Sequence, residues 1–274
     1  MKYFISCFLF IFTLNVFSAD IEVSGAPVKQ GDFFTVLIPE TDYDITFKGN
    51  KTDIKIYNNR ETAVAIIPVH YSTSVGTYPL KVTRGGKEIF TRDIKVTDGG
   101  FEKSYITVDK TMKKKRSDSN MKAMINHTRE ARKTSSDTKL WKKEFHYPVP
   151  ERITSPYGAM RFINNKVSGY HSGIDFGVPI GTPVKAANSG RVILSMTLTS
   201  TGNTIIIDHG YNLFSSYAHL DSLGVDVGDI VESGQLIGRS GNTGFTTGPH
   251  LHFTMSIGNT FINPMLLMEK ELLE

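Results

Sequence analysis

Apolar residues occur in short alternating runs between residues 21 and 97, and turn-forming residues separate one run from the next. The runs cover residues 33–38, 43–47, 54–57, 62–69 and 78–82. Alternation with a period of two is the pattern of a half-buried strand, and several such runs at regular spacing are typical of a small β-sandwich. The sequence therefore predicts a β-sandwich-like domain at the N-terminal end.

A glycine pair marks one turn of this region. Gly85 and Gly86 separate the apolar runs 80–82 and 89–96. Glycine accepts the positive φ angles that two-residue hairpin turns require. We therefore expect a β-hairpin across this pair.

The pattern changes between residues 99 and 143. A basic run occupies residues 113–116, and Met121 to Lys133 has helical periodicity, with Met121, Met124 and Ile125 on one side. This stretch is interpreted as a basic connector that contains a helix. The charge run is either a solvated face or a contact for anionic wall polymer or lipid headgroups.

Residues 144–274 return to β-type runs, at 184–187, 191–194, 204–208, 213–218 and 250–256. Residues 225–231 alternate around a Gly-Asp turn, which predicts a second hairpin. Asn263 and Pro264 have the sequence of a helix start, with Asn263 as N-cap, so a short C-terminal helix should bury Leu266, Leu267 and Leu272.

The first residues have the pattern of a secretory signal. Lys2 precedes an apolar run over residues 4–16, and small residues follow at Ser18 and Ala19. The run is short for a bilayer-spanning helix, which needs about 20 residues, so a cleaved signal is favoured over a membrane anchor. The predicted division is a signal peptide at 1–19, the N-terminal β domain at 20–98, the connector at 99–143 and a C-terminal domain at 144–274.

Composition excludes some chemistries. The chain of 274 residues has one cysteine, Cys7, which lies inside the predicted signal, so the mature chain offers neither a disulfide framework nor a cysteine nucleophile. A serine hydrolase is disfavoured because no G-x-S-x-G motif occurs. The formal net charge of +4 fits an anionic envelope as a partner, but no nucleic-acid motif accompanies it.

Histidines gather in the C-terminal part of the chain. Of the eight in the sequence, those after residue 169 are His171, His209, His219, His250 and His252. His171 and Asp175 are four apart in a glycine-rich, extended stretch, where their side chains face the same way. On a strand, His250 and His252 would also share a face.

Three of these residues have the chemistry of a catalytic metal site. Two histidines and one carboxylate with an open fourth position form a known zinc set, and His171, Asp175 and His252 would supply it. A closed structural site would normally recruit a fourth ligand, often cysteine, which the mature chain lacks. We therefore expect one Zn²⁺ per chain.

The region from residue 145 to residue 264 resembles the M23 zinc metallopeptidases, the lysostaphin and LytM-type group. The matching stretches are residue 148, residues 155–158 with Arg161, and residues 171–176, 179–184, 190–192, 208–210, 217–220, 227–231, 234–238, 241–244, 247–253 and 263–264. They cover nearly the whole C-terminal domain.

The resemblance implies a compact antiparallel β fold in which His171, Asp175 and His252 bind zinc and His219 and His250 are catalytic. It also implies an enzyme that hydrolyses stem-peptide cross-links of peptidoglycan, as a D,D-endopeptidase or, in a related version, a carboxypeptidase. Which histidine is the base and which donates to the oxyanion stays open. The alternatives are a non-catalytic wall-binding or regulatory module of the same fold and a β binding protein with a structural zinc.

Other residues are candidates for substrate binding. Arg161 either holds a substrate carboxylate or pairs with an acid of its own domain. Tyr217 either lines the site or packs in the core, and His209 is a weaker candidate that could simply end a strand.

The predicted location is the periplasm, with peptidoglycan as the partner. The N-terminal domain is expected to place the enzyme, contact envelope proteins or cover the other domain. An upstream side chain could therefore inhibit the site. The sequence predicts no oligomeric state.

Overall fold

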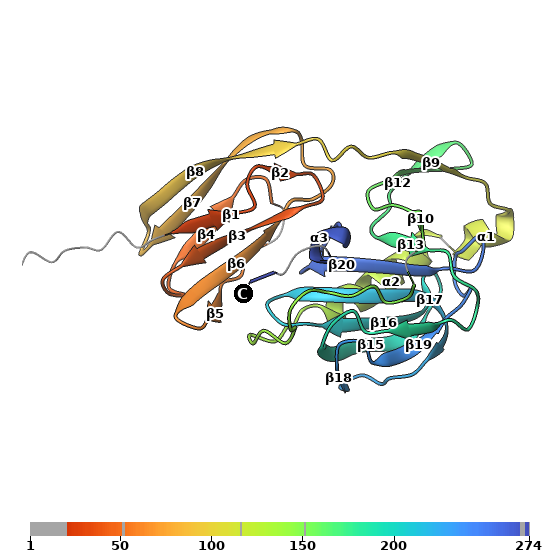
Figure 1. Ribbon diagram of the computed structural model, residues 1–274. Coiled ribbons are helices and arrows are strands. Elements are labelled where there is room, and N and C mark those ends of the chain that lie inside the picture. The colour runs from red at the N-terminus through yellow and green to blue at the C-terminus, as the bar shows by residue number, and fades with distance from the viewer. Residues whose placement is uncertain (1–20, 51–52, 116, 151, 269–271, 274) are drawn as a thin grey trace, which may run out of the picture.

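The computed structural model describes residues 21–50, 53–115, 117–150, 152–268 and 272–273. The predicted signal peptide lies outside the described residues. Figure 1 shows two β-rich bodies side by side, joined by a chain that crosses between strands β8 (Lys87–Thr97) and β9 (Lys103–Ile106). Among the described residues, no helix has the length and apolar character that a membrane span requires.

The N-terminal body is a sandwich of two sheets, as predicted. One sheet has the order β1 (Glu22–Ser24), β3 (Phe33–Ile38), β6 (Thr62–Pro68) and β5 (Tyr57–Asn59), and the other β2 (Val28–Lys29), β8, β7 (Gly76–Arg84) and β4 (Asp44–Phe47). Alternate residues of both sheets, including Phe34, Val36, Val82 and Ile94, form one buried cluster between them. Burial of this apolar surface is the main force that holds the two sheets together.

The predicted hairpin is confirmed. Strands β7 and β8 pair antiparallel from Gly76↔Val96 to Arg84↔Lys87, and Gly85 and Gly86 form the turn with φ angles of 56° and 77°. Both angles lie in the left-handed region that favours glycine.

Helices α1 (Lys110–Lys115) and α2 (Asp118–Ala131) follow β9. Helix α2 confirms the predicted helix but begins earlier, because Ser117 caps it by accepting a hydrogen bond from the Asn120 amide at 3.5 Å. Strand β9 is new. It pairs in parallel with β11 (Met160–Ile163), which also pairs with β12 (Lys166–Tyr170), so the connector adds a strand to the C-terminal body.

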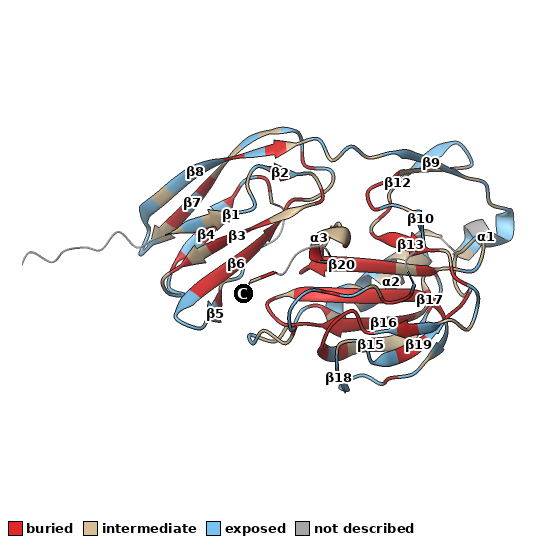
Figure 2. Ribbon diagram, viewed as in Figure 1, coloured by how far each residue is buried: buried red, intermediate tan, exposed pale blue. Residues whose placement is uncertain are grey.

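The C-terminal body is built on a large antiparallel sheet, as predicted. Its main path is β10 (Ile153–Ser155), β13 (Ile174–Phe176), β20 (Leu251–Ile257), β17 (Leu213–Leu223), β16 (Gly202–Asp208), β15 (Gly190–Leu198) and β18 (Ile230–Val231). Strands β14 (Pro183–Lys185), β19 (Leu236–Ser240) and β21 (Thr260–Ile262) pair beside it. Figure 2 shows buried residues concentrated on the central strands β16, β17 and β20.

The short C-terminal helix is also confirmed. Helix α3 (Met265–Met268) begins after Asn263, whose Oδ1 accepts a hydrogen bond from the Met265 amide at 3.2 Å. Leu267 and Leu272 are buried in the core of the C-terminal body, as predicted, whereas Leu266 is only partly buried.

The hairpin expected at residues 225–231 is wrong. The stretch makes a tight turn, in which the Asp229 amide donates to the Asp226 carbonyl and Gly228 has a φ of 102°. Strand β18 then pairs with Gly190 and Arg191 of β15 instead of folding back on its own neighbours. Of the apolar residues in this stretch, Val225 and Val231 are buried, whereas Val227 and Ile230 are mostly exposed.

Aromatic residues join the two bodies. The rings of Tyr57 and Tyr211 stack at 4.9 Å between centroids, and the Tyr211 hydroxyl donates to the Asn58 carbonyl. Tyr71 and Tyr170 stack at 4.7 Å. Val64 and Ile66 of β6 belong to the hydrophobic core of the C-terminal body, so the bodies share buried apolar surface.

Candidate metal centre and active site

His171 and Asp175 flank Gly173, at the point where their segment comes close to strand β20. His171 follows β12, and Asp175 is the middle residue of β13. Gly173 separates them, and a Cβ at this position would lie 2.1 Å from the Phe253 carbonyl oxygen on β20. Glycine therefore allows the 171–175 segment to lie directly against β20.

The register between β13 and β20 brings in the third residue. Asp175 and His252 are directly opposite each other in the antiparallel pairing. Side chains of directly opposed residues point to the same face of a sheet, with Cβ atoms about 5 Å apart. The pairing thus places both side chains beside His171, which is 1% exposed.

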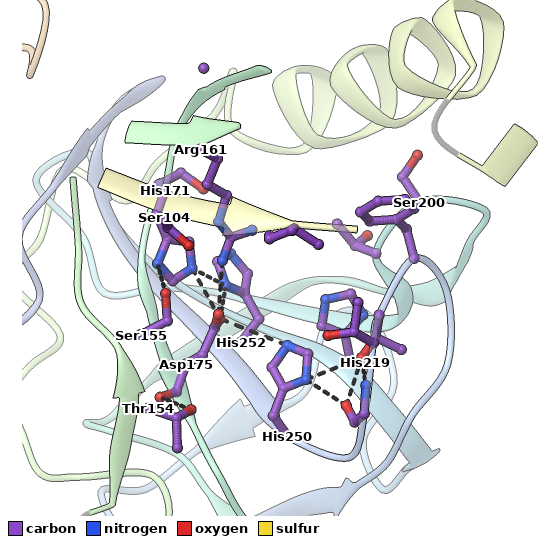
Figure 3. A pocket seen from close by; sticks show the side chains of 18 of the residues that line it. Ser104, Thr154, Ser155, Arg161, His171, Asp175, Ser200, His219, His250 and His252 are labelled. Atoms are coloured by element: carbon purple, nitrogen blue, oxygen red, sulfur yellow. Dashed lines mark hydrogen bonds and ion pairs between the residues drawn. The ribbon is translucent and has the colours of Figure 1, made fainter. Parts of the chain in front are cut away.

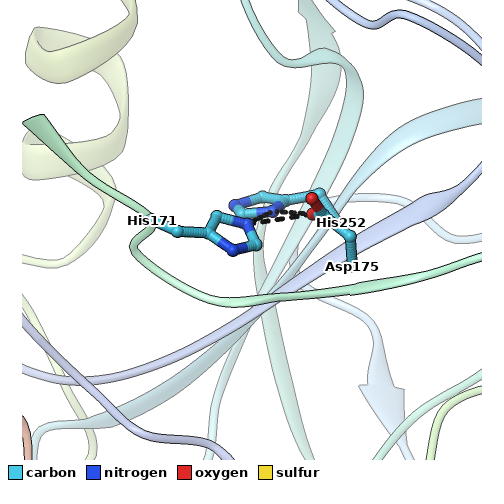
Figure 4. Close-up of side chains that lie close together, drawn as sticks. All are labelled: His171, Asp175 and His252. Atoms are coloured by element: carbon cyan, nitrogen blue, oxygen red, sulfur yellow. Dashed lines mark hydrogen bonds and ion pairs between the residues drawn. The ribbon is translucent and has the colours of Figure 1, made fainter. Parts of the chain in front are cut away.

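The three side chains converge on one point (Figure 4). Asp175 Oδ1 lies 3.0 Å from His171 Nε2 and 2.7 Å from His252 Nδ1, and these two nitrogens are 3.0 Å apart. A candidate ligand atom from each residue lies within 4.8 Å of the other two. These separations allow all three atoms to contact a single ion.

The protonation of these groups fits a cation. The other nitrogen of His171, Nδ1, lies 2.8 Å from the Pro156 carbonyl oxygen and donates to it, so in the neutral ring the Nε2 lone pair faces the cluster. Burial lowers the pKa of His252 to about 4, so its ring is neutral at pH 7. With the proton of His252 on Nε2, its Nδ1 lone pair would also face the carboxylate, an arrangement that a metal ion would stabilise.

Asp175 is ionised in this setting. Burial alone would raise the pKa of its carboxyl group, but the imidazoles of His171 and His252, which contact Oδ1, outweigh burial and hold the pKa well below its usual range. Arg161 adds an ion pair, with one guanidinium nitrogen 2.8 Å from Asp175 Oδ2. Of the two roles predicted for Arg161, the structure thus shows the pairing with an acid of its own domain.

His219 and His250 lie next to the cluster. Their rings are 4.7 Å apart between centroids, and His250 Nε2 is 3.8 Å from Asp175 Oδ1. His250 comes just before β20 and bridges to Gly241, whereas His219 lies within β17 with a φ of 61°. Such left-handed backbone is uncommon outside glycine and gathers at functional sites.

Backbone carbonyls fix the tautomer of both rings. Nδ1 of His219 donates to the Thr243 carbonyl at 2.8 Å, and Nδ1 of His250 donates to the Gly248 carbonyl at 2.8 Å. In the neutral rings, Nε2 therefore carries the free lone pair. Burial and the neighbouring imidazoles lower the pKa of His219 to about 3, so this ring is neutral at physiological pH.

These side chains share one cavity of about 450 Å³ (Figure 3). His171, Asp175, His219, His250 and His252 all line it, together with Arg161. Further lining residues come from segments that the sequence did not associate with the site: Ser104, Ile106, Met121, Met124, Ser200 and Phe245. The only sequence signal for the two methionines is their shared helix face.

Two of the predicted substrate-binding residues lie elsewhere. His209 and Tyr217 are both 0% exposed and are absent from the cavity lining. His209 Nδ1 donates to the Ser189 carbonyl at 2.8 Å, and its Nε2 lies 2.8 Å from Ser215 Oγ. The Tyr217 hydroxyl accepts from the Ala187 amide at 2.8 Å. Both side chains therefore satisfy their polar groups inside the core.

A known protein family matches only part of this chain. The model of peptidase family M23 matches residues 169–264, which include the five clustered residues. These residues are an M23 domain. The M23 domain carries both the candidate metal ligands and the two further histidines, whereas β9 and α2 lie outside it.

Two relatives are similar to this chain over less than half of its length. An uncharacterized metalloprotease of Buchnera aphidicola is 39% identical over 131 residues, which are 47% of this chain and 35% of that protein. Peptidoglycan DD-endopeptidase ShyA of Vibrio cholerae is 39% identical over 123 residues, 43% of this chain and 28% of that protein. The chain thus spans about a third of the length of the curated relatives it matches.

The two-body fold has a solved counterpart. A crystal structure from Pseudomonas aeruginosa, assigned to peptidase M23, covers 89% of this chain and 96% of its own, with a TM-score of 0.67 and 24% identity. This likeness shows that the overall fold of the chain, with both of its bodies, occurs in another protein.

Proposed function

We propose that this chain is an exported zinc peptidase that cleaves the stem-peptide cross-links of peptidoglycan. The observation that carries the proposal is the convergence of His171, Asp175, His252, His219 and His250 on one cavity. Relatives with the same domain are named peptidoglycan DD-endopeptidase and DD-carboxypeptidase/endopeptidase, so both activities on stem peptides fall within the proposal.

His171, Asp175 and His252 would hold the zinc ion. Two imidazole nitrogens and one carboxylate, with no fourth protein ligand in the group that the described residues form, match an open catalytic set. When bound, zinc lowers the pKa of a coordinated water to about 7 and polarises a carbonyl group.

We assign the base to His250. Its Nδ1 proton is held by the Gly248 carbonyl, and its free Nε2 lies 3.8 Å from Asp175 Oδ1, one of the candidate ligand atoms. This Nε2 takes the proton from water and passes it to the leaving amine. His219, with its own Nε2 free, lies beside it and orients the attacking water or the substrate.

The remaining side chains hold the site in shape. Arg161 fixes Asp175 through its ion pair, and the Pro156 carbonyl fixes the ring of His171. Such outer contacts orient metal ligands and keep them in one tautomer.

Export to the periplasm follows from the signal pattern at residues 1–19 together with the substrate. We further propose that residues 20–98 form a separate domain that contacts envelope proteins. This domain packs on the peptidase body through the Tyr57 and Tyr71 ring stacks, so it is a fixed part of the enzyme.

The test is mass spectrometry of purified sacculi digested with the full-length chain. We expect cross-linked dimers to be converted to monomers, and we expect this to stop with a chelator and in His250→Ala. An Asp221→Asn control changes an exposed acid away from the cavity and should remain active. Intact dimers with the zinc-loaded wild-type chain would support the non-catalytic module instead.

A further inference from the structure

The cavity has walls of two different origins. Its polar part, with the histidines and Asp175, belongs to the M23 domain. Another part comes from Ile106 on β9 and from Met121 and Met124 on α2, all of which lie upstream of the matched residues. The connector therefore completes the cavity of the domain that follows it.

These three apolar side chains do not belong to a core. Each is partly exposed, and each packs on none of the hydrophobic clusters that the described residues form. Met121 and Met124 are three residues apart and share a helix face, whereas the next residue, Ile125, is 40% exposed and does not line the cavity. The apolar surface of the two methionines is thus directed at the cavity.

The apolar wall is held in place at both ends. Lys115 Nζ donates to the Gly244 carbonyl at 2.9 Å, and Ser200 Oγ donates to the Lys115 carbonyl at 3.1 Å. At the other end of α2, the buried Arg132 donates to Ser216 Oγ at 2.8 Å. Strand β9 is fixed by its pairing with β11. The wall is therefore formed before any ligand binds.

We propose that Ile106, Met121 and Met124 form an apolar subsite that receives the aliphatic side chain next to the peptide bond that is cut. This proposal rests on the proposed function and adds which side chain of the substrate the site prefers. Concave sites use apolar walls to bind and a few polar groups to orient, which matches the two parts of this cavity. Methionine adapts its shape, so the subsite fits a small aliphatic group such as the methyl of alanine.

The test compares two substrates on the full-length, zinc-loaded chain. One is a cross-linked stem-peptide dimer with D-alanine on the carbonyl side of the cross-link, and the other has glycine at that position. We expect the wild-type chain to prefer alanine by about tenfold or more in kcat/KM, as one methyl group in an apolar pocket allows. In the double variant Met121→Ala, Met124→Ala, KM for the alanine substrate should rise and the preference should fall towards one.

Matched variants separate this role from folding. Ile125→Ala removes an aliphatic side chain from the same helix outside the cavity and should keep the preference. Met121→Leu with Met124→Leu keeps an apolar wall and should restore most of it. If the double alanine variant does not fold, Ile106→Ala tests the wall from β9.

Two results would overturn the subsite. One is an unchanged alanine preference in the folded double variant. The other is a faster rate on both substrates, which would make α2 an obstruction to the cavity. If the wild-type chain cleaves neither substrate, the proposed function fails. Calorimetric Kd values for the two peptides then test whether the apolar subsite exists. Equal affinities in the wild-type chain would refute the subsite, and tighter alanine binding that the double variant loses would support it.

Discussion

Asp175 Oδ1 lies 2.7 Å from Nδ1 of His252, a residue 77 positions later in the chain. The contact exists because the two residues are opposed in the pairing of β13 with β20. The sheet therefore sets the geometry of the candidate ligands before a metal ion binds, and changes to the ligands and to the sheet should have separable effects.

Asp175→Asn should weaken zinc binding without unfolding the chain. The amide keeps the size of the side chain but removes the negative charge from between two imidazoles. Loss of outer contacts alone costs about 10- to 100-fold in metal affinity, so loss of the charged ligand should reach about 100-fold or more. Competition titration against a chelator measures the zinc affinity of each chain, with Asp221→Asn as the control. Equal affinities would show that zinc binds elsewhere.

Removal of zinc should lower thermal stability. A ligand that binds only the folded chain stabilises it by about 2.7 kcal/mol at a concentration of 100 times Kd. For a chain of this size that corresponds to about 5 to 10 °C in Tm. Scanning calorimetry with and without chelator checks this. The His171→Ala chain should show no chelator effect, and an equal shift in both proteins would point to another metal site.

His209 should make the folded chain sensitive to acid. Burial lowers the pKa of its ring to about 4, against 6.5 in the unfolded chain, so the unfolded state binds more protons between these values. Its contribution to stability is complete above pH 6.5 and is lost as the pH falls towards 4, by about 3 kcal/mol in total.

Urea unfolding at a series of pH values tests this contribution. His209→Gln keeps a hydrogen-bonding side chain that does not titrate, so the variant should show a shallower loss of stability between pH 6.5 and 4. Both chains should be measured in the same metal-loaded form, so that the pH dependence of metal binding is common to the two. Identical slopes would assign the acid sensitivity to other groups.

Gly173→Ala should destabilise the fold at the site. The added Cβ would lie 2.1 Å from the Phe253 carbonyl oxygen and 2.7 Å from Thr254 Cγ2, so β13 must move away from β20. Such overpacking costs about 1–3 kcal/mol. Gly76→Ala is the matched control, because its Cβ would meet Tyr78 only at ordinary contact distance, 3.7 Å. Chemical unfolding measures both, and equal losses would contradict the close approach.

The parts of the fold that follow from local patterns were predictable. A few neighbouring residues were enough to predict each of three features. These are the strands at residues 33–38 and 62–69, the Gly85-Gly86 turn and the Asn263 cap. The candidate metal ligands could be predicted for a similar reason, because histidines in glycine-rich, extended segments form a distinctive sequence pattern.

The parts that depend on distant partners were not predictable. Residues 103–106 are a strand only because β11 lies alongside, and Ile230 and Val231 pair with β15 instead of with residues 225–227. Tyr217 could not be assigned to the site or the core, because β17 is buried on both faces from Leu213 to Leu220. Alternation of apolar and polar residues identifies the buried face of a strand only when the other face is exposed. Both faces of β17 are buried, so its sequence does not show which way Tyr217 points.

The parallel pairing of β9 with β11 makes the connector inseparable from the body that holds the candidate metal site. A chain shortened to begin near Lys142, the obvious way to isolate an active fragment, would leave β11 with an unpaired edge and would remove Ile106 and both methionines from the cavity. Such a fragment would be prone to edge-to-edge association and would have an altered cavity, so measurements on it would not report on the intact protein.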